Sequence, residues 1–396
     1  MLTEEIQLAA SQYLMNTYAR LPLSIVRGKG SKVYDSEGRE YLDCVAGIAV
    51  NILGHGHPEL VTAIERQARQ LIHTSNLYYT EPQVRLAQLL VTHSFAQKVF
   101  FGNSGAEANE AAIKLARRYA TQKFGEARHE IITFRQSFHG RTMATLTATG
   151  QTKVQLGFAP LLPGFYYATF NDWASVESVL TDNTAAIMIE LIQGEGGVQV
   201  VDRDFLHQLR QLCTERDILL VFDEIQTGMG RTGTLFAYEH YGIEPDIMTL
   251  AKGLGGGFPI GACLATDDIA RAFEPGSHAS TFGGNPLACS AAIAVLEVLL
   301  NGELEKSRLI GAYLQKGLLE LQTRNALIQE VRGQGLLQGL QLSIEGQPIV
   351  QDCQARRVLI NCTMDRVLRL VPPLIITQPE IDLVLTVLSD VLNKRL

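Results

Sequence analysis

The sequence has no closely paired cysteines: its six cysteines occur singly, and none lies in a Cys-x-x-Cys arrangement. Such spacing argues against a disulfide framework and is typical of buried thiols in a reducing compartment. Glu4 and Glu5 stand where a signal peptide would have basic residues, and no uninterrupted apolar stretch approaches the length of a membrane span. We therefore expect a cytoplasmic protein that has no membrane partner.

Clusters of positive charge are also lacking. The chain has 34 Lys and Arg against 41 Asp and Glu, a net charge of −7, and its basic residues are scattered. This distribution argues against a nucleic-acid partner. His55 and His57 lie in His-Gly-His-Pro without a clustered third ligand, so we expect a turn there and no metal site.

The sequence contains no repeat, low-complexity tract or Ser/Pro-rich linker, so domain limits must be inferred from changes in pattern. Over residues 60–287, apolar runs at 98–101, 130–134, 185–189, 218–222 and 247–250 alternate with helix-like segments. This pattern predicts an α/β domain with a mostly parallel sheet. Residues 288–396, with helical spacing at 287–300 and 306–321 and strand-like runs at 335–342 and 367–370, predict a smaller α+β domain. Residues 1–59, with a hairpin over 33–42, are expected to pack on that smaller domain.

Two of the predicted strands end in a polar side chain. Asp223 follows the run at 218–222, and Lys252 follows the run at 247–250 and precedes four glycines in five positions. Open parallel sheets bind ligands at the carboxyl ends of their strands. A lysine can form a Schiff base with the aldehyde of pyridoxal phosphate, and an acid can pair with its ring nitrogen. Taken singly, Asp223 also fits a strand-end cap and Lys252 a solvated side chain.

Other ligand chemistries compete with this interpretation. The glycine run does not match the dinucleotide fingerprint Gly-x-Gly-x-x-Gly, because Phe258 occupies the position of the third glycine. Gln226, three residues after Asp223, is placed to donate a hydrogen bond to the phenolate oxygen of a pyridoxal ring. The alternative for Gln226 is an ordinary surface residue.

A phosphate site is indicated where the run at 98–101 passes into a helix. Ser104 and Glu107 have the spacing of a capping box, and the small residues Gly105 and Ala106 leave the first N–H groups of the helix accessible to an anion. A capped helix after a strand needs no ligand, so this motif alone does not decide between the two interpretations.

Two arginines have neighbours that suggest binding of carboxylates. Phe138 could stack on a flat ring while Arg141 binds a carboxylate with two hydrogen bonds. Arg369 is a charge inside an apolar strand and therefore needs a partner, for which Glu195 in Gln-Gly-Glu-Gly-Gly is the candidate. A purely structural ion pair between Glu195 and Arg369 is the alternative.

Taken together, these motifs resemble the class III (omega) pyridoxal-phosphate aminotransferases and, among them, the bacterial acetylornithine aminotransferases. The resemblance runs nearly end to end and is carried by residues 46–51, 54–58, 103–109, 138–141, 223–228, Lys252 with its glycines, and 280–286. It implies fold-type I architecture, with a mostly parallel seven-stranded sheet in the large domain, and a homodimer whose active sites lie at the interface.

The resemblance also implies residue roles. Lys252 would be the catalytic residue that carries the cofactor. The implied cofactor-binding residues are Ser104, Gly105, Ala106, Phe138, Asp223, Glu224, Ile225, Gln226 and, across the subunit interface, Thr281. The implied substrate-binding residues are Arg141, Glu195, Ser280 and Arg369. In this scheme Glu195 neutralises Arg369 while the amino donor binds and releases it when 2-oxoglutarate binds.

Three positions depart from related sequences. Leu191 replaces a frequent proline, and Ala106 replaces a threonine whose hydroxyl would contact the phosphate. Gly47 aligns with a tyrosine that recognises the free end of ornithine in ornithine aminotransferases, so we expect room for an N-acyl group.

The reaction implied by the resemblance is transfer of the terminal amino group of N2-acetylornithine to 2-oxoglutarate, in arginine biosynthesis. Succinylornithine, ornithine and 4-aminobutyrate aminotransferases remain alternatives, as do an aminomutase of the same fold, a non-catalytic regulator that binds pyridoxal phosphate and, less favoured, a nicotinamide dehydrogenase.

Overall fold

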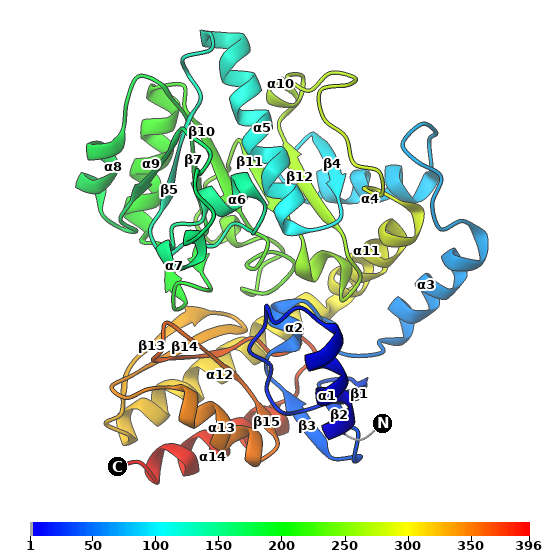
Figure 1. Ribbon diagram of the computed structural model, residues 1–396, viewed down its shortest axis with the longest axis vertical. Helices are drawn as coiled ribbons and strands as arrows, with labels where there is room; N and C mark the ends of the chain where they lie inside the picture. Colours follow the sequence, from blue (N-terminus) through cyan, green and yellow to red (C-terminus); the bar gives the residue numbers. More distant parts are fainter. Residues whose placement is uncertain (1–2) are drawn as a thin grey trace.

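The computed structural model describes residues 3–396 and has a seven-stranded sheet at its centre (Figure 1). Across the sheet the strands are β4 (Lys98–Gly102), β12 (Gly261–Ala265), β11 (Ile247–Leu250), β10 (Leu219–Asp223), β7 (Thr184–Ile189), β5 (Glu130–Phe134) and β6 (Phe165–Ala168). Only β12 runs against its neighbours. The predicted mostly parallel seven-stranded sheet is therefore confirmed, with β6 and β12 as strands that the sequence analysis did not anticipate.

Helices cover both faces of this sheet. Successive strand residues point to opposite faces, and they accordingly belong to two separate apolar clusters. Val221 packs in the cluster that contains the apolar side of α5 (Gly105–Phe124), whereas Phe222 packs in the cluster that contains α9 (Arg203–Glu215). Because both faces are buried, the strands are almost wholly apolar until their carboxyl ends, where the polar side chains gather.

The two ends of the chain come together below the central sheet in Figure 1. The C-terminal sheet has the order β13 (Ile328–Gln334), β14 (Leu337–Leu342), β17 (Val367–Leu370) and β16 (Asn361–Thr363), with helices α12 (Leu304–Arg324), α13 (Gln347–Ala355) and α14 (Gln378–Asn393). The N-terminal strands β1 (Ile25–Lys29), β2 (Lys32–Asp35) and β3 (Glu40–Asp43) are extended by β15 (Val358–Leu359), which pairs with β3 in parallel. The hairpin over 33–42 is present as the antiparallel pair β2 and β3, and β15 pairs with β3, while the division into domains stays a prediction.

The remaining elements connect these sheets. The helices are α1 (Thr3–Tyr13), α3 (Pro58–Gln70), α4 (Glu81–Thr92), α6 (Met143–Ala148), α7 (Thr152–Gln155), α8 (Trp173–Val179), α10 (Asp267–Ala270) and α11 (Pro286–Val298). The shorter elements are the strands β8 (Ile192–Gln193) and β9 (Gln199–Val200), the 3₁₀ turns η1 (Ala237–His240) and η2 (Lys252–Gly255), and the π-helical turn η3 (Leu299–Glu303).

The segment α2 (Ala46–Ala49) is a left-handed turn. Its four residues have φ values of +48°, +65°, +64° and +61°, and Ile48 is β-branched. Left-handed conformation costs an L-residue about 1–2 kcal/mol, so such a turn persists only where its surroundings fix it. The backbone on both sides is fixed by the chain beyond β17, because Val371 N donates to Cys44 O (2.9 Å) and Leu374 N donates to Ile52 O (2.7 Å).

One helical stretch in the described chain, Pro286–Arg324, is long and apolar enough to cross a membrane by length and composition. The sequence analysis did not anticipate it. The stretch is interrupted at η3, where Asn301 and Gly302 leave helical geometry, and its apolar first part, α11, packs against α3, α4 and η2. Nearly all residues of α11 are buried inside the protein, so α11 is a core helix.

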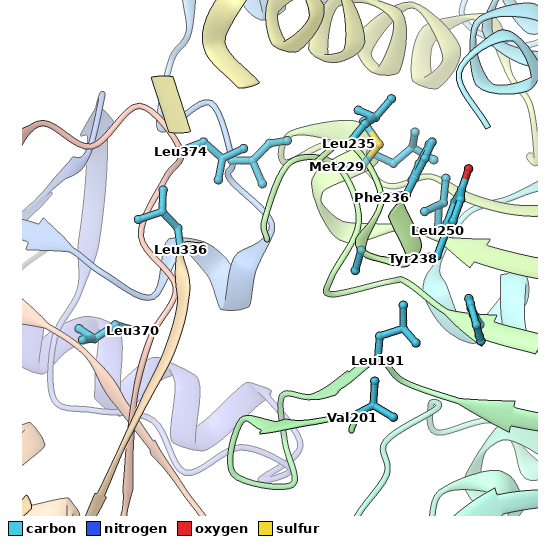
Figure 2. Packing of buried hydrophobic residues seen from close by; sticks show 14 of the residues in the cluster. Leu191, Val201, Met229, Leu235, Phe236, Tyr238, Leu250, Leu336, Leu370 and Leu374 are labelled. Carbon is cyan, nitrogen blue, oxygen red and sulfur yellow. The ribbon is translucent and has the colours of Figure 1, made fainter. Parts of the chain in front are cut away.

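The largest apolar cluster links the central sheet to the C-terminal part (Figure 2). Leu191 and Val201 lie side by side in it, and Leu336 and Leu374 join it from loops of the C-terminal part. Leu191 is fully buried, and its carbonyl accepts a hydrogen bond from Val201 N (3.0 Å). The leucine that replaces the frequent proline therefore serves core packing.

Candidate active site

A cavity of about 430 Å³ lies at the carboxyl ends of β10 and β11. Predicted site residues from five different segments line it: Ser104, Gly105, Ala106, Phe138, Arg141, Glu195, Asp223, Ile225, Gln226 and Lys252. Strand-end convergence of this kind is what an open parallel sheet produces. Val50, which follows the left-handed turn, and the segment 257–260 complete the wall.

Asp223 is the most firmly held of these side chains. Its Oδ2 accepts hydrogen bonds from Asn109 Nδ2 (2.8 Å) and His139 Nδ1 (2.7 Å), and its Oδ1 accepts one from Ile225 N (3.1 Å). Because an ionised carboxylate only accepts, His139 carries its proton on Nδ1. Three donors stabilise the charge of Asp223 in a buried position, yet no Lys or Arg pairs with it among the described residues. The site therefore presents a buried carboxylate without a fixed cation.

Lys252 lines the same cavity at the start of η2, immediately after β11 and Ala251. Its φ of +40° is unusual for a residue with a side chain and is the kind of backbone strain that clusters at functional sites. Burial lowers the pKa of the Lys252 amine, and the Arg369 guanidinium lowers it further, against the raising effects of Glu195 and Asp223. A larger fraction of the amine is therefore neutral than for a solvated lysine.

The start of α5 provides free N–H groups. Ser104 caps the helix by accepting a hydrogen bond from Glu107 N (3.2 Å). The N–H groups of Gly105 and Ala106, at the first two helical positions, have no acceptor within the helix. The reciprocal half of the predicted capping box differs, because the Glu107 carboxylate accepts from Asn103 N (2.6 Å) instead of from Ser104 N. Glu107 thus fixes the loop before the helix.

Glu195 and Arg369 form a close ion pair at the cavity wall. Arg369 Nη1 donates to Glu195 Oε1 at 2.6 Å and lies 3.4 Å from Gln226 Oε1, while Arg369 Nε donates to Asn361 Oδ1 (3.3 Å). Arg369 is almost fully buried, whereas Glu195 is partly exposed to the cavity. Burial alone would raise the pKa of Glu195, but Arg369 and Lys252 together hold it below its usual value. Gln226 is buried beside this pair, so it is not an ordinary surface glutamine.

A second cavity of about 440 Å³ opens outward from the first and shares Phe138, Arg141 and Glu195 with it. The Arg141 guanidinium lies 5.5 Å from the centre of the Phe138 ring. The outer wall carries one more cation and two acids, and its lining includes Lys153, Glu345, Gln347, Met364 and Asp365. Together the cavities extend from Lys252 past Arg141 to the surface.

Four predicted site residues lie outside the lining of the inner cavity. Arg369 pairs with Glu195, which lines the cavity, but Arg369 does not line the cavity itself. Ser280 lies beside the cavity, where its Oγ accepts from Asn103 Nδ2 (3.1 Å), and Thr281 is exposed. The side chain of Glu224 faces away from the cavity and accepts hydrogen bonds from Ala237 N (2.6 Å) and Tyr238 N (2.8 Å).

Glu224 therefore has a structural role as a side chain. Burial raises the pKa of Glu224 to about 7, and its carboxyl group caps the turn η1 from within the core.

The placement of Gly47 differs from the expected one. Gly47 is exposed and does not line either cavity; Val50 contributes the wall instead. Its φ of +65° gives an independent reason for glycine, and an added Cβ would come within 3.0 Å of Asn51 Nδ2. Space for an N-acyl group at Gly47 stays a prediction.

The sequence analysis assigned no role to Asn109, His139 or Glu190. Asn109 is fully buried and links Asp223 to Thr249, whose Oγ1 donates to Asn109 Oδ1 (2.7 Å). The feature of the sequence that could have identified Asn109 is a polar residue on the apolar side of a helix. Glu190 lines the cavity and follows an all-apolar strand, the same pattern that identified Asp223.

These groups fit pyridoxal phosphate. The Asp223 carboxylate suits a cationic ring nitrogen, Lys252 suits an aldehyde, and the free N–H groups of Gly105 and Ala106 suit a phosphate. Within residues 3–396, no group of three His, Cys, Asp or Glu side chains is arranged to hold a metal.

The fold and the site together define a pyridoxal-phosphate-dependent enzyme of the aminotransferase class. The chain belongs to the class III aminotransferases, since the family model "Aminotransferase class-III" matches residues 13–392. This family depends on pyridoxal phosphate.

Individual relatives resemble the chain over nearly its whole length. An acetylornithine aminotransferase of Caldanaerobacter subterraneus subsp. tengcongensis is 55% identical over 385 residues, which cover 97% of this chain and 98% of that relative. The ornithine aminotransferase of Toxoplasma gondii has a TM-score of 0.96 at 33% identity, covering 100% of this chain and 96% of that one. The N-acetylornithine aminotransferase of Stenotrophomonas maltophilia has a TM-score of 0.84 at 40% identity, covering 98% and 99%.

The structural role of Glu224 can be tested by substitution. Glu224→Ala should lower the free energy of unfolding by about 2–4 kcal/mol, because it leaves two buried N–H groups without an acceptor. Urea unfolding of the two proteins measures this difference. Glu224→Gln keeps one of the two acceptor oxygens and turns its NH2 group toward the other N–H, so it should also lose stability, but less than Glu224→Ala. Equal stability of the alanine variant and the parent would contradict this role.

Proposed function

We propose that this protein transfers the terminal amino group of N2-acetylornithine to 2-oxoglutarate, forming N-acetylglutamate 5-semialdehyde and glutamate, in arginine biosynthesis. The observation that carries this proposal is the Glu195–Arg369 ion pair beside Lys252, because a releasable arginine lets one site accept two substrates with different charges. The acetylornithine aminotransferases at about 50% identity support the same substrate.

The cofactor sets the chemistry, and the chain positions it. When bound, pyridoxal phosphate supplies an aldehyde for reversible amine exchange and a ring that withdraws electrons. Asp223 would hold the ring nitrogen protonated, Gln226 would donate to the ring hydroxyl, and Phe138 would cover the ring. Gly105 and Ala106 would bind the phosphate through their N–H groups, and Ser104 and Ile225 line the same wall.

Lys252 has two tasks in this proposal. Its Nζ would hold the cofactor covalently in the resting enzyme and, as a free amine, would take the proton from the carbon that bears the amino group of the donor and later release it. The second task requires a neutral amine. Burial favours this state, since it lowers the pKa of Lys252.

The ion pair alternates between two states during a catalytic cycle. With acetylornithine bound, Glu195 occupies Arg369, and the uncharged stem of the donor passes beside the pair while Arg141 binds the distant carboxylate. With 2-oxoglutarate bound, Glu195 moves away, Arg369 binds the carboxylate next to the keto group, and Arg141 binds the other one. Bidentate arginine–carboxylate pairing suits both positions.

The outer cavity bears on the acyl group. Glu345 and Asp365 line it with Lys153 and Arg141, so a donor whose carboxylate pairs with the cations places its α-nitrogen substituent toward the acids. An acetyl group is neutral and is tolerated there. A succinyl group carries a second carboxylate, which the two acids repel.

Ornithine is the second candidate substrate, because the same two acids would attract its free α-ammonium group. The overall similarity to ornithine aminotransferase of Toxoplasma gondii is consistent with this alternative. The two candidates differ only in the group on the α-nitrogen, so direct comparison of donors decides between them.

We further propose a cytoplasmic homodimer. The segment 71–80 exposes Leu77 (82%), Tyr78 (66%) and Tyr79 (99%), and it adjoins exposed Phe282 (58%), whose ring lies 5.2 Å from that of His73. Asn76 Nδ2 donates to Gly283 O (2.9 Å), which joins this segment to the loop that holds Ser280 and Thr281. An apolar surface of this kind suits a second copy of the chain, which would bring Thr281 toward the neighbouring phosphate site.

Steady-state kinetics tests the substrate. The kcat/KM of the purified protein for acetylornithine should exceed those for succinylornithine, ornithine and 4-aminobutyrate, with 2-oxoglutarate as acceptor. The kcat/KM for acetylornithine should exceed that for succinylornithine by at least about threefold. The factor is modest because Glu345 and Asp365 are exposed to solvent, which weakens their repulsion of the succinyl carboxylate. A tenfold or larger preference for ornithine or 4-aminobutyrate would reject the proposal.

Replacement of the lysine tests its role. Lys252→Ala should keep the fold and lower kcat by about 10³-fold or more, since it removes both the covalent attachment and the proton carrier. Circular dichroism checks the fold, and single-turnover kinetics with acetylornithine measures the loss. Near-parental turnover in the variant would refute the assignment of Lys252.

Replacement of the glutamate tests the ion pair. Glu195→Ala should raise kcat/KM for glutamate as amino donor by about tenfold, because Arg369 is then permanently free and about 1.4 kcal/mol of competition disappears. The matched control is Glu305→Ala, which removes an exposed acid that pairs with Arg308 on α12. If glutamate reacts at the parental rate in Glu195→Ala, the alternation of Arg369 is wrong.

A further inference from the structure

Glu190 is a cavity residue for which the reaction above has no use. It follows β7 directly, as Asp223 ends β10, and the two strands are parallel with Ile189 opposite Phe222. In that register Glu190 and Asp223 are neighbours at the carboxyl ends of β7 and β10, and both line the inner cavity. Two acids thus stand side by side where the ring of the cofactor is expected.

The two acids have very different partners. Asp223 accepts three hydrogen bonds, whereas the hydrogen bond found for the Glu190 side chain is the one that its Oε2 accepts from Phe138 N (3.0 Å). Glu190 is 7% exposed and forms no ion pair within the described chain. A buried carboxylate without a cation or a full set of donors is costly, and such a group binds a proton instead.

The surrounding acids also favour the protonated form of Glu190. The charged groups around Glu190 are Asp223 at the end of β10, Lys252 in η2 and Glu195 between β8 and β9, while His139 on the Phe138 segment is engaged with Asp223. Burial first, and then the charge of Asp223, raise the pKa of Glu190 well above its usual value, and the Phe138 N–H and Lys252 offset only part of this effect.

We propose that Glu190 is a positioning residue that works as an uncharged carboxylic acid, anchoring the backbone of Phe138 over the cofactor and leaving Asp223 as the single anion beneath the ring. This inference rests on the proposed cofactor placement and deepens it. The neutral carbonyl oxygen of Glu190 is sufficient to accept the Phe138 N–H, so no charge is needed for the anchor.

The proposal explains why one acid is so strongly supported and the other is not. A ring nitrogen that must stay protonated needs one adjacent negative charge, and a second ionised acid would repel the first. Asp223 receives the three donors that stabilise its charge, whereas Glu190 receives one backbone donor, which favours the ionised form but which the carbonyl oxygen of an uncharged acid can also accept. The segment that contains Phe138 also contains His139 and Arg141. A shift of this segment would therefore move the ring of Phe138, the hydrogen bond from His139 to Asp223 and the proposed carboxylate site of Arg141 together.

Cofactor affinity tests the anchor. Equilibrium dialysis of pyridoxal phosphate against the parent, Glu190→Gln and Glu190→Ala is the measurement, and it involves no amino donor. Glu190→Ala should bind at least tenfold more weakly than the parent, and Glu190→Gln should recover most of that loss because glutamine is an uncharged acceptor of the same length. The matched control is Glu130→Gln, another buried glutamate, whose partners Tyr166 and Thr181 are remote from the cavity.

The charge state is tested by the pH dependence of stability, measured by urea unfolding of the holoenzyme at fixed cofactor concentration between pH 5 and 8. A carboxyl group whose folded-state pKa is raised keeps a proton that the unfolded chain releases, so its contribution to stability is present at low pH and is lost as pH rises. The parent should therefore lose stability with rising pH more steeply than Glu190→Gln, by up to a tenfold change in the unfolding constant per pH unit.

The outcomes separate cleanly. Equal cofactor affinity of Glu190→Ala and Glu190→Gln would show that the carboxyl group does not anchor Phe138. Equal pH slopes of the parent and Glu190→Gln would show that Glu190 is ionised in the site. Either result overturns the inference. A failure of acetylornithine as substrate would leave both measurements unchanged, so the two proposals can fail independently.

Discussion

The buried carboxylate of Asp223 is the interaction on which the rest of the site depends. Its three donors come from the N-terminal part of α5, from the segment after β5 and from the turn after β10, so a single charge ties together three segments around the central sheet. Because three donors hold it, the carboxylate has a fixed position. Its remaining side faces the cavity. Thr249 on β11 extends the same network and brings in the strand that precedes Lys252.

The cavity is built around a balance of charge. The acids Asp223 and Glu195 face the bases Lys252 and Arg369, and the one close pair among them, Glu195 with Arg369, is also the one that borders the outer cavity. Asp223 is held by three hydrogen-bond donors, whereas Glu195 is held by one opposite charge. In the proposed function this difference combines a rigid cofactor site with a substrate site that can change.

Much of this could be predicted from the sequence because the central strands are buried on both faces. Continuous apolar runs gave β5, β11 and β17 their observed bounds, and the polar residues that end such runs pointed to Asp223 and Lys252. Strand β12 was not predicted because Gly261–Ala265 consists mostly of small residues with little β propensity. Strand β6 was not predicted because it is an edge strand with an irregular pattern. The direction of side chains was harder to predict from the sequence. Glu224 adjoins Asp223 in sequence, but its side chain points into the core, and Gly47 owes its position to backbone conformation.

The left-handed turn at Ala46–Ala49 ties the completion of the cavity to the order in which the chain is made. A free peptide of this sequence would not adopt such a turn, so Val50 reaches the cavity wall only after residues 371–374 have hydrogen-bonded to the backbone on either side of it. Those residues are synthesised more than three hundred positions later. A nascent chain can therefore form the central sheet, with both Asp223 and Lys252 in place, while one wall of its active site is still missing.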